Sequence, residues 1–210
     1  MKGLKAIVLD FDGVLVESVG IKDRAYEIIF GGYPHFDEII EYCHANNATI
    51  RFDKFRHVYQ HILRQKYTED IEKELSRKFS QLVVQKIIEC PSVPGALEFL
   101  DFFYKKVPMY LASINSHEEL KRILEARNMA HYLKDIYTIP WLKEDALKDI
   151  LKNENSDPDQ VVFIGDSPED YQSAQKAGVR FIGRSSNKRL DQYDISVCRD
   201  LFEVMKIMNS

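Results

Sequence analysis

The segment that most constrains the fold is residues 5–18, which read KAIVLDFDGVLVES. An uninterrupted apolar run from Ala6 to Leu9 ends at Asp10, and Asp12 follows two positions later. A short apolar run of this kind is typical of a strand buried on both faces of a parallel sheet. Carboxylates at the end of such a strand lose hydration, and a hard cation is the partner that best offsets the loss. Gly13 permits the tight turn that must follow.

Chain length, charge and cysteine usage limit what kind of protein this is. The 210 residues suffice for one sizeable domain, or one domain with a smaller insert. The net charge of −4 provides no basic field for nucleic acid. No apolar run approaches the roughly 20 residues that cross a membrane, and the first predicted strand begins too early for a signal peptide. The cysteines form neither a disulfide framework nor a metal-binding spacing. We expect a soluble cytoplasmic protein, either a monomer or a small homo-oligomer.

Two patterns of apolar residues divide the chain. Residues 17–91 have helical spacing and no strand signal, which predicts a small all-helical unit of four helices. From residue 92 to residue 210 helices alternate with strands, which predicts parallel strands joined by right-handed crossovers. Residues 1–16 supply the first strand of the same sheet. The expected fold is α/β, a doubly wound, Rossmann-like parallel sheet with a helical insert after its first strand.

The alternating part has four predicted helices and four predicted strands. The helices are expected at 96–104, 118–127, 144–151 and 171–177. The strands are expected at 107–112, 135–139, 161–164 and 179–182.

Polar residues follow the ends of four predicted strands. In chain order they are Asp10 and Asp12, then Ser113, then Lys143, then Asp166 and Asp170. Ligands of parallel sheets bind outside the carboxyl ends of the strands, so we expect these side chains to converge. Carboxylates able to hold Mg²⁺, together with an ammonium and a hydroxyl, form a set that can carry out phosphoryl transfer.

The segments DFDGVLVES, LASINS, Lys143 and IGDSPED, in this order, resemble the four motifs of the haloacid dehalogenase-like superfamily. The resemblance covers the sheet-forming parts on both sides of the helical insert. It implies a nucleophile at Asp10, a general acid/base at Asp12, a phosphate-binding hydroxyl at Ser113 and a steadying lysine at Lys143. It also implies a Mg²⁺ ion held by Asp10, by the backbone carbonyl of Asp12 and by Asp166, with Asp170 as a further or outer acidic residue.

The resemblance also implies an activity. It predicts a phosphatase that acts on a small phosphorylated metabolite through an aspartyl-phosphate intermediate. Relatives that cleave carbon–halogen bonds lack an acidic residue at the position of Asp12, so its presence favours phosphate esters. The helical insert corresponds to the family's helical cap, which closes over the site and sets substrate choice.

Two assignments have competing interpretations. Lys148 is an alternative to Lys143 as the motif lysine, because relatives often have proline after that lysine and here Glu144 follows. Asp170 could serve only as a helix-capping acid, because Ser167 and Pro168 before it read as an N-cap and a first helical residue.

Candidate substrate-binding residues come from two regions. Ile114 and Asn115 follow Ser113 directly, and Asn115 either contacts substrate or merely turns the chain. In the helical insert, Arg51 and Lys54 are about one helical turn apart and could bind a second anionic group.

Three alternative functions stay open. A phosphomutase resembling β-phosphoglucomutase would return the phosphoryl group to a sugar instead of to water. A phosphonate hydrolase would need a Schiff-base lysine in the insert, such as Lys22 or Lys54. The third alternative is a non-catalytic module that binds phosphate or a partner protein. In such a module the burial of carboxylates would cost free energy and serve no reaction.

Overall fold

A computed structural model describes residues 3–46, 49–186 and 190–209 of the chain. The chain divides into two compact units. One consists of Met1–Glu17 together with Cys90–Ser210, and the other is Ser18–Glu89. The boundaries expected from the sequence fall after residue 16 and before residue 92.

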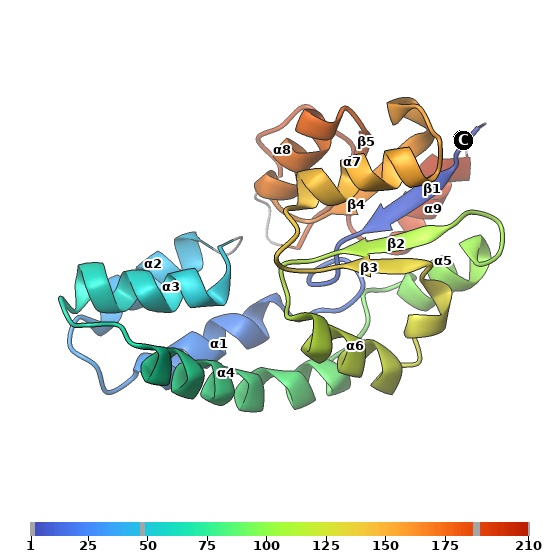
Figure 1. The fold of residues 1–210 in the computed structure, drawn as a ribbon. Helices are drawn as coiled ribbons and strands as arrows, with labels where there is room; N and C mark the ends of the chain where they lie inside the picture. Colours follow the sequence, from blue (N-terminus) through green and yellow to red (C-terminus); the bar gives the residue numbers. More distant parts are fainter. Residues whose placement is uncertain (1–2, 47–48, 187–189, 210) are drawn as a thin grey trace. The chain divides into compact units, whose positions relative to one another are not determined.

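The first unit contains a parallel sheet of six strands in the order β3-β2-β1-β4-β5-β6 (Figure 1). The strands are β1 (Ala6–Leu9), β2 (Met109–Ala112), β3 (Asp135–Tyr137), β4 (Val161–Gly165), β5 (Arg180–Arg184) and β6 (Val197–Cys198). Every neighbouring pair is parallel, which confirms the predicted fold class. Because β1 lies between β2 and β4, the strand order reverses beside it, and ligands of such sheets bind at that reversal.

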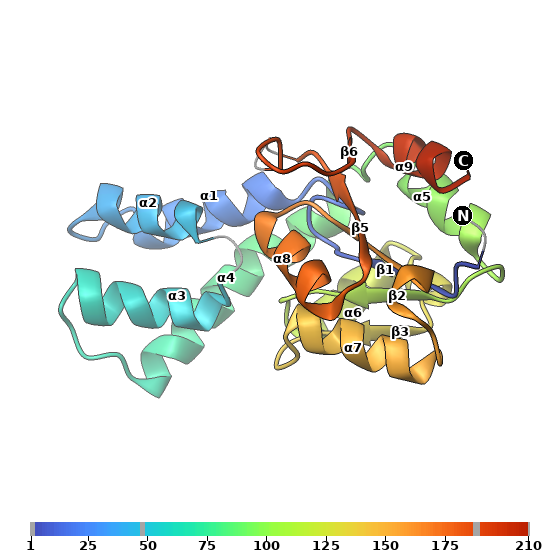
Figure 2. The ribbon, with the colours of Figure 1, turned by 90° about the horizontal axis from the view of Figure 1, so that it is seen from above.

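Helices cover both faces of this sheet (Figures 1 and 2). The inner strands are buried, so their alternate residues supply two cores. On one face Val8 and Phe163 pack in a cluster with residues of α7 (Lys143–Asn153) and α8 (Pro168–Ala177). Helices α5 (Ala96–Phe103) and α6 (His117–Ala126) lie on the other face, and α9 (Leu201–Asn209) packs against α5.

The second unit is helical and has an apolar core of its own. Its elements are α1 (Val19–Phe30), α2 (Phe36–Ala45), α3 (Arg51–His57), a π-helical turn at Val58–Ile62, and α4 (Glu69–Glu89). The core contains four buried aromatic rings, those of Tyr26, Phe30, Phe55 and Phe79. The centroids of neighbouring rings are 5.0 to 6.1 Å apart. No helix within the described residues is long and apolar enough to cross a membrane.

Several element boundaries differ from the predictions. The apolar spacing of Phe52, Phe55, Val58, Tyr59 and Ile62 predicts one helix over residues 52–62, but α3 ends at His57 and a π-helical turn follows. Strand β2 begins at Met109 and not at the predicted Val107, because Val107 and Pro108 belong to the loop before the strand. Neither β6 nor α9 is among the elements predicted from the sequence. A strand of two residues is too short to show a period-2 pattern.

Candidate active site

The end of β1 carries two acidic residues through a tight turn. Asp10 continues the pairing of β1 with β4, since its backbone N–H donates to the carbonyl of Ile164 at 2.9 Å. This continuation draws the side chain of Asp10 into the protein, where it is 6% exposed. The chain then turns at Gly13, whose φ of +74° is in the left-handed region.

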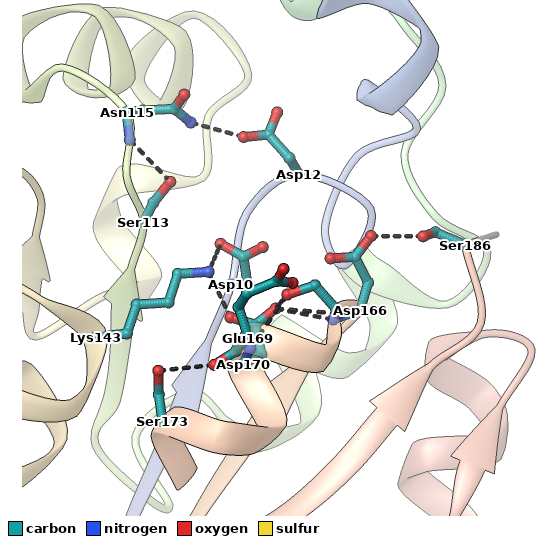
Figure 3. Close-up of polar contacts among 11 residues, drawn as sticks. Asp10, Asp12, Ser113, Asn115, Lys143, Asp166, Glu169, Asp170, Ser173 and Ser186 are labelled. Atoms are coloured by element: carbon teal, nitrogen blue, oxygen red, sulfur yellow. Dashed lines mark hydrogen bonds and ion pairs between the residues drawn. The ribbon is translucent and has the colours of Figure 1, made fainter. Parts of the chain in front are cut away.

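Lys143, the first residue of α7, brings two of the acids together (Figure 3). Its Nζ lies 3.0 Å from Oδ1 of Asp10 and 2.5 Å from Oδ1 of Asp170. Lys148, the competing candidate, is half-exposed, and its Nζ lies 3.6 Å from Glu144 on the same helix. Of the two lysines, Lys143 is therefore the one that lies beside the predicted nucleophile.

Asp170 makes contacts both at the start of α8 and within the acidic cluster. Oδ2 of Asp170 accepts hydrogen bonds from the backbone N–H and the hydroxyl of Ser167, and the Ser167 hydroxyl accepts from the backbone N–H of Asp170. The same Oδ2 also accepts from the backbone N–H of Asp166 at 3.2 Å. Its other oxygen, Oδ1, contacts Lys143. Asp170 thus caps α8 and also fixes Lys143. This arrangement requires Gly165, because a β-carbon there would lie 2.5 Å from Cβ of Asp170.

The carboxylates of Asp10, Asp166 and Asp170 could together hold a metal ion. One oxygen from each lies within 4.8 Å of the others, and all three residues are buried. Hard oxygen ligands of this kind suit Mg²⁺, which usually takes one or two carboxylates and completes its shell with water and phosphate oxygens. The side chain of Asp12 does not belong to this cluster.

The charge balance of the cluster favours a cation. Burial raises the pKa of Asp10 to about 8. Lys143 acts to lower this pKa, but the nearby carboxylates of Asp170, Asp166 and Asp12 act to raise it. Burial also raises the pKa of Asp166 to about 7, with Asp170 adding to the effect and a hydrogen bond from Ser186 opposing it. A divalent cation among these oxygens would stabilise their ionised forms, so the donor set fits a metal ion.

Lys143 stays charged in this environment. Burial by itself lowers the pKa of its ammonium, but the carboxylates of Asp10 and Asp170 outweigh that effect and the net pKa is raised. The side chain is therefore a permanent positive charge beside Asp10. It can attract the oxygens of a transferring phosphoryl group.

The residues after β2 approach the same edge of the sheet. Ser113 is buried, and its backbone N–H donates to the carbonyl of Tyr137 at 2.9 Å, while Ile114 and Asn115 are half-buried. The amide of Asn115 donates from Nδ2 to Oδ2 of Asp12 at 2.8 Å (Figure 3). No local pattern in the sequence predicts this link.

The end of β5 also contributes to the site, which the sequence analysis missed. Ser186 donates from its hydroxyl to Oδ2 of Asp166 at 2.5 Å. Arg184 is buried, and its Nη1 donates to the carbonyl of Gly13 at 3.0 Å and to the carboxylate of Glu17 at 3.0 Å. Extending the strand-end rule to the fifth strand would have identified both residues.

The two candidate residues of the helical unit have contacts within that unit. Lys54 is 2% exposed, its Nζ donates to the carbonyl of Cys43 at 2.9 Å, and it lies 4.8 Å from the ring centroid of Tyr26. Arg51 is half-buried, and its Nη1 donates to the hydroxyl of Ser80 at 3.4 Å. Lys54 is therefore part of the interior of the unit, whereas Arg51 keeps partial exposure.

Comparisons with known proteins agree with this architecture. A family model described as haloacid dehalogenase-like hydrolase matches residues 7–184. A phosphoglycolate phosphatase from Pseudomonas fluorescens is 26% identical over 191 residues, which cover 86% of this chain and 69% of that protein. A haloacid dehalogenase-like family protein from Streptococcus pneumoniae has a TM-score of 0.73 at 18% identity, covering 99% of this chain and 100% of that one. CbbY from Rhodobacter sphaeroides, in complex with phosphate, has a TM-score of 0.74 at 16% identity, covering 96% of each chain.

Proposed function

Because the chain belongs to the haloacid dehalogenase-like hydrolases, we propose that it is a magnesium-dependent phosphatase acting on a small phosphorylated metabolite. One observation carries the proposal: Lys143 lies 3.0 Å from Asp10, at the point where three buried carboxylates lie within 4.8 Å of one another. The 26% identity to a phosphoglycolate phosphatase also supports a phosphate monoester as substrate.

In the first step Asp10 attacks phosphorus. A carboxylate oxygen of Asp10 forms a bond to phosphorus while the bond from phosphorus to the alcohol oxygen breaks, which leaves an aspartyl-phosphate. Asp12 delivers a proton to the departing oxygen, so the product leaves as a neutral alcohol. Lys143 and the hydroxyl of Ser113 bind the non-bridging oxygens as charge develops on them.

In the second step water replaces Asp10. Asp12, now ionised, takes a proton from the water as it attacks phosphorus, and Asp10 leaves as a carboxylate. The residues that would hold Mg²⁺ are Asp10, Asp166 and the backbone carbonyl of Asp12, with Asp170 holding Lys143 in place. The ion would supply positive charge that screens the phosphoryl group from the surrounding carboxylates.

The helical unit is the proposed source of substrate selectivity. A second anionic group on the substrate would find Arg51 as its partner there, since a guanidinium binds carboxylates and phosphates through two parallel hydrogen bonds. Lys54, the other candidate of this unit, donates a hydrogen bond from its ammonium to the carbonyl of Cys43, so we expect it to affect binding only through the structure of the unit.

A panel of phosphate esters tests the proposal. Phosphoglycolate, hexose phosphates, mononucleotides and p-nitrophenyl phosphate would be scored by released phosphate, with Mg²⁺ and with EDTA. We expect release only with the metal, and none from Asp10→Asn protein that retains its circular dichroism spectrum. Wild-type turnover by Asp10→Asn would exclude this nucleophile. Isomerised sugar phosphate without net release would instead indicate a phosphomutase.

A further inference from the structure

Asn115 and Asp12 are joined by a hydrogen bond across the site. Nδ2 of Asn115 donates to Oδ2 of Asp12 at 2.8 Å, although the two residues are 103 positions apart. Figure 3 shows the carboxylate of Asp12 directed toward Asn115, while that of Asp10 is directed toward Lys143. We propose that Asn115 is a positioning residue that holds Asp12 where it can protonate the leaving group. This inference rests on the proposed phosphatase function.

The side chain of Asp12 needs such a partner. Asp12 is half-buried at the start of the turn that Gly13 forms, and its carboxylate does not belong to the cluster of Asp10, Asp166 and Asp170, so contacts with other elements decide which staggered side-chain state it adopts. Proton transfer needs the donor and acceptor atoms within about 2.6–3.2 Å of each other. A single preferred side-chain orientation therefore raises the fraction of protein that is ready to react.

Asn115 is well placed to impose this orientation. It follows the end of β2, where the backbone N–H of Ser113 is bonded to the carbonyl of Tyr137 in β3. The backbone N–H of Asn115 points back to the hydroxyl of Ser113 at 3.4 Å. Asn115 therefore lies in the short connection between the end of β2 at Ala112 and the start of α6 at His117, and both ends of this connection are held by regular structure that does not involve Asp12.

A direct role in substrate binding makes a different prediction. An asparagine that bound the phosphoryl group would affect all phosphate esters alike, whatever alcohol they carry. An asparagine that acts through Asp12 matters only where the leaving oxygen needs a proton. Alkyl phosphates need that proton, whereas p-nitrophenyl phosphate releases a stable phenolate. The parameter to compare is kcat/KM, because it reports only the steps up to departure of the alcohol.

The test combines Asn115→Leu, Asp12→Ala and the double variant. The substrates are p-nitrophenyl phosphate and the fastest alkyl phosphate of the panel above. We expect Asn115→Leu to lower kcat/KM for the alkyl phosphate roughly tenfold to a hundredfold and for p-nitrophenyl phosphate less than about threefold. In the Asp12→Ala background, Asn115→Leu should cause no further loss, because the hydrogen bond to Asp12 is already absent.

Two further variants keep the test decisive. Asn115→Asp preserves the size and shape of the side chain, so it tests the role of Asn115 even if Asn115→Leu unfolds. Its carboxylate cannot donate the hydrogen bond to Asp12, so it should also reduce the turnover of alkyl phosphates selectively. Asn153→Leu is the matched control. Nδ2 of Asn153 donates to Oδ2 of Asp149 over the same distance of 2.8 Å, and neither residue belongs to the site. This variant should leave both rates unchanged.

The possible results separate this inference from the proposed function. Equal losses on both substrates, or a loss that persists in the Asp12→Ala background, would overturn the positioning role and leave the phosphatase intact. Wild-type protein that hydrolyses neither substrate would overturn the proposed function, and the inference with it.

Discussion

Gly13 lies so close to Asp166 that a β-carbon on it would be 2.2 Å from the carboxylate oxygen Oδ2. The turn after β1 and the end of β4 therefore approach each other through a position that has no side chain. The φ of +74° at Gly13 adds a second reason for glycine, since other residues are strained in this region. This close approach allows the turn that carries Asp12 to lie against Asp166.

Gly13→Ala is expected to displace Asp166 and abolish most activity. The left-handed backbone alone should cost roughly 1 kcal/mol of stability, and the clash adds to that loss. Gly178→Ala is a matched control, because Gly178 has the same φ of +74° but its β-carbon would lie 3.6 Å from Pro158. The measurements are phosphate release and thermal unfolding. Equal losses of activity in the two variants would contradict the role of the close approach.

Lys143→Met is expected to remove activity, whereas Lys148→Met is not. The first substitution leaves the buried carboxylates of Asp10 and Asp170 without their ammonium, and the second removes a half-exposed ion pair with Glu144. Steady-state kinetics should show at least about a hundredfold loss of kcat for Lys143→Met. A comparable loss in Lys148→Met would reverse the assignment of the motif lysine.

Metal-free protein should lose stability as the pH rises from 5 to 8. The pKa of Asp10 is raised to about 8 and that of Asp166 to about 7, so the folded state binds more protons than the unfolded state in this range. Unfolding free energy then falls with rising pH. Carboxylates whose pKa is lowered act below this window. Burial lowers the pKa of His57, which acts within the window in the opposite direction, but it is one group against two.

Added Mg²⁺ should reverse that trend. Its ligands must be deprotonated, so the metal should raise the Tm more at pH 8 than at pH 5. Thermal unfolding in EDTA and in Mg²⁺ at both pH values measures the difference. Asp166→Asn should abolish most of the gain. A gain that is the same at both pH values and survives in Asp166→Asn would place the metal elsewhere.

Arg184→Met should destabilise the turn that leads out of β1. The guanidinium donates to the carbonyl of Gly13 and to Glu17, and its loss removes charge-assisted hydrogen bonds from a buried position. We expect a loss of about 2–3 kcal/mol in urea unfolding, together with reduced kcat. Arg199→Met is the control, since Arg199 is 86% exposed and pairs with Glu203. Similar unfolding midpoints for the two variants would exclude this function of Arg184.

Lys54→Met should affect stability more than substrate binding. Its ammonium satisfies the carbonyl of Cys43 inside the helical unit, and loss of that bond should cost roughly 1–2 kcal/mol. The half-exposed Lys78, which pairs with Glu74, provides a control in Lys78→Met. Thermal unfolding and the KM of the best substrate are the measurements. A raised KM with an unchanged Tm would indicate that Lys54 contacts substrate directly.

Local patterns in the sequence determined the first five strands of the sheet, the helical insert and the candidate acids. The run from Ala6 to Leu9 is continuous, apolar and followed by Asp10, so burial of the strand and the position of its carboxylate are both encoded within a few residues. The same holds for β4 and Asp166. The alternation of helices and strands then specified parallel strands, because crossover connections permit little else.

Only the tertiary structure decided which side chains meet. Asn115 and Asp12 are 103 positions apart, and Arg184 and Gly13 are 171 apart. The strand-end rule can select Asn115 and Arg184 as candidates, but nothing in the sequence predicts their partners, because asparagine and arginine at strand ends are equally compatible with exposed turns. Likewise, Lys143 and Lys148 are both on α7, and only the packing of that helix on the sheet brings the first of them to Asp10. A strand can be encoded by its own residues, whereas a contact depends on the register of every element between its partners.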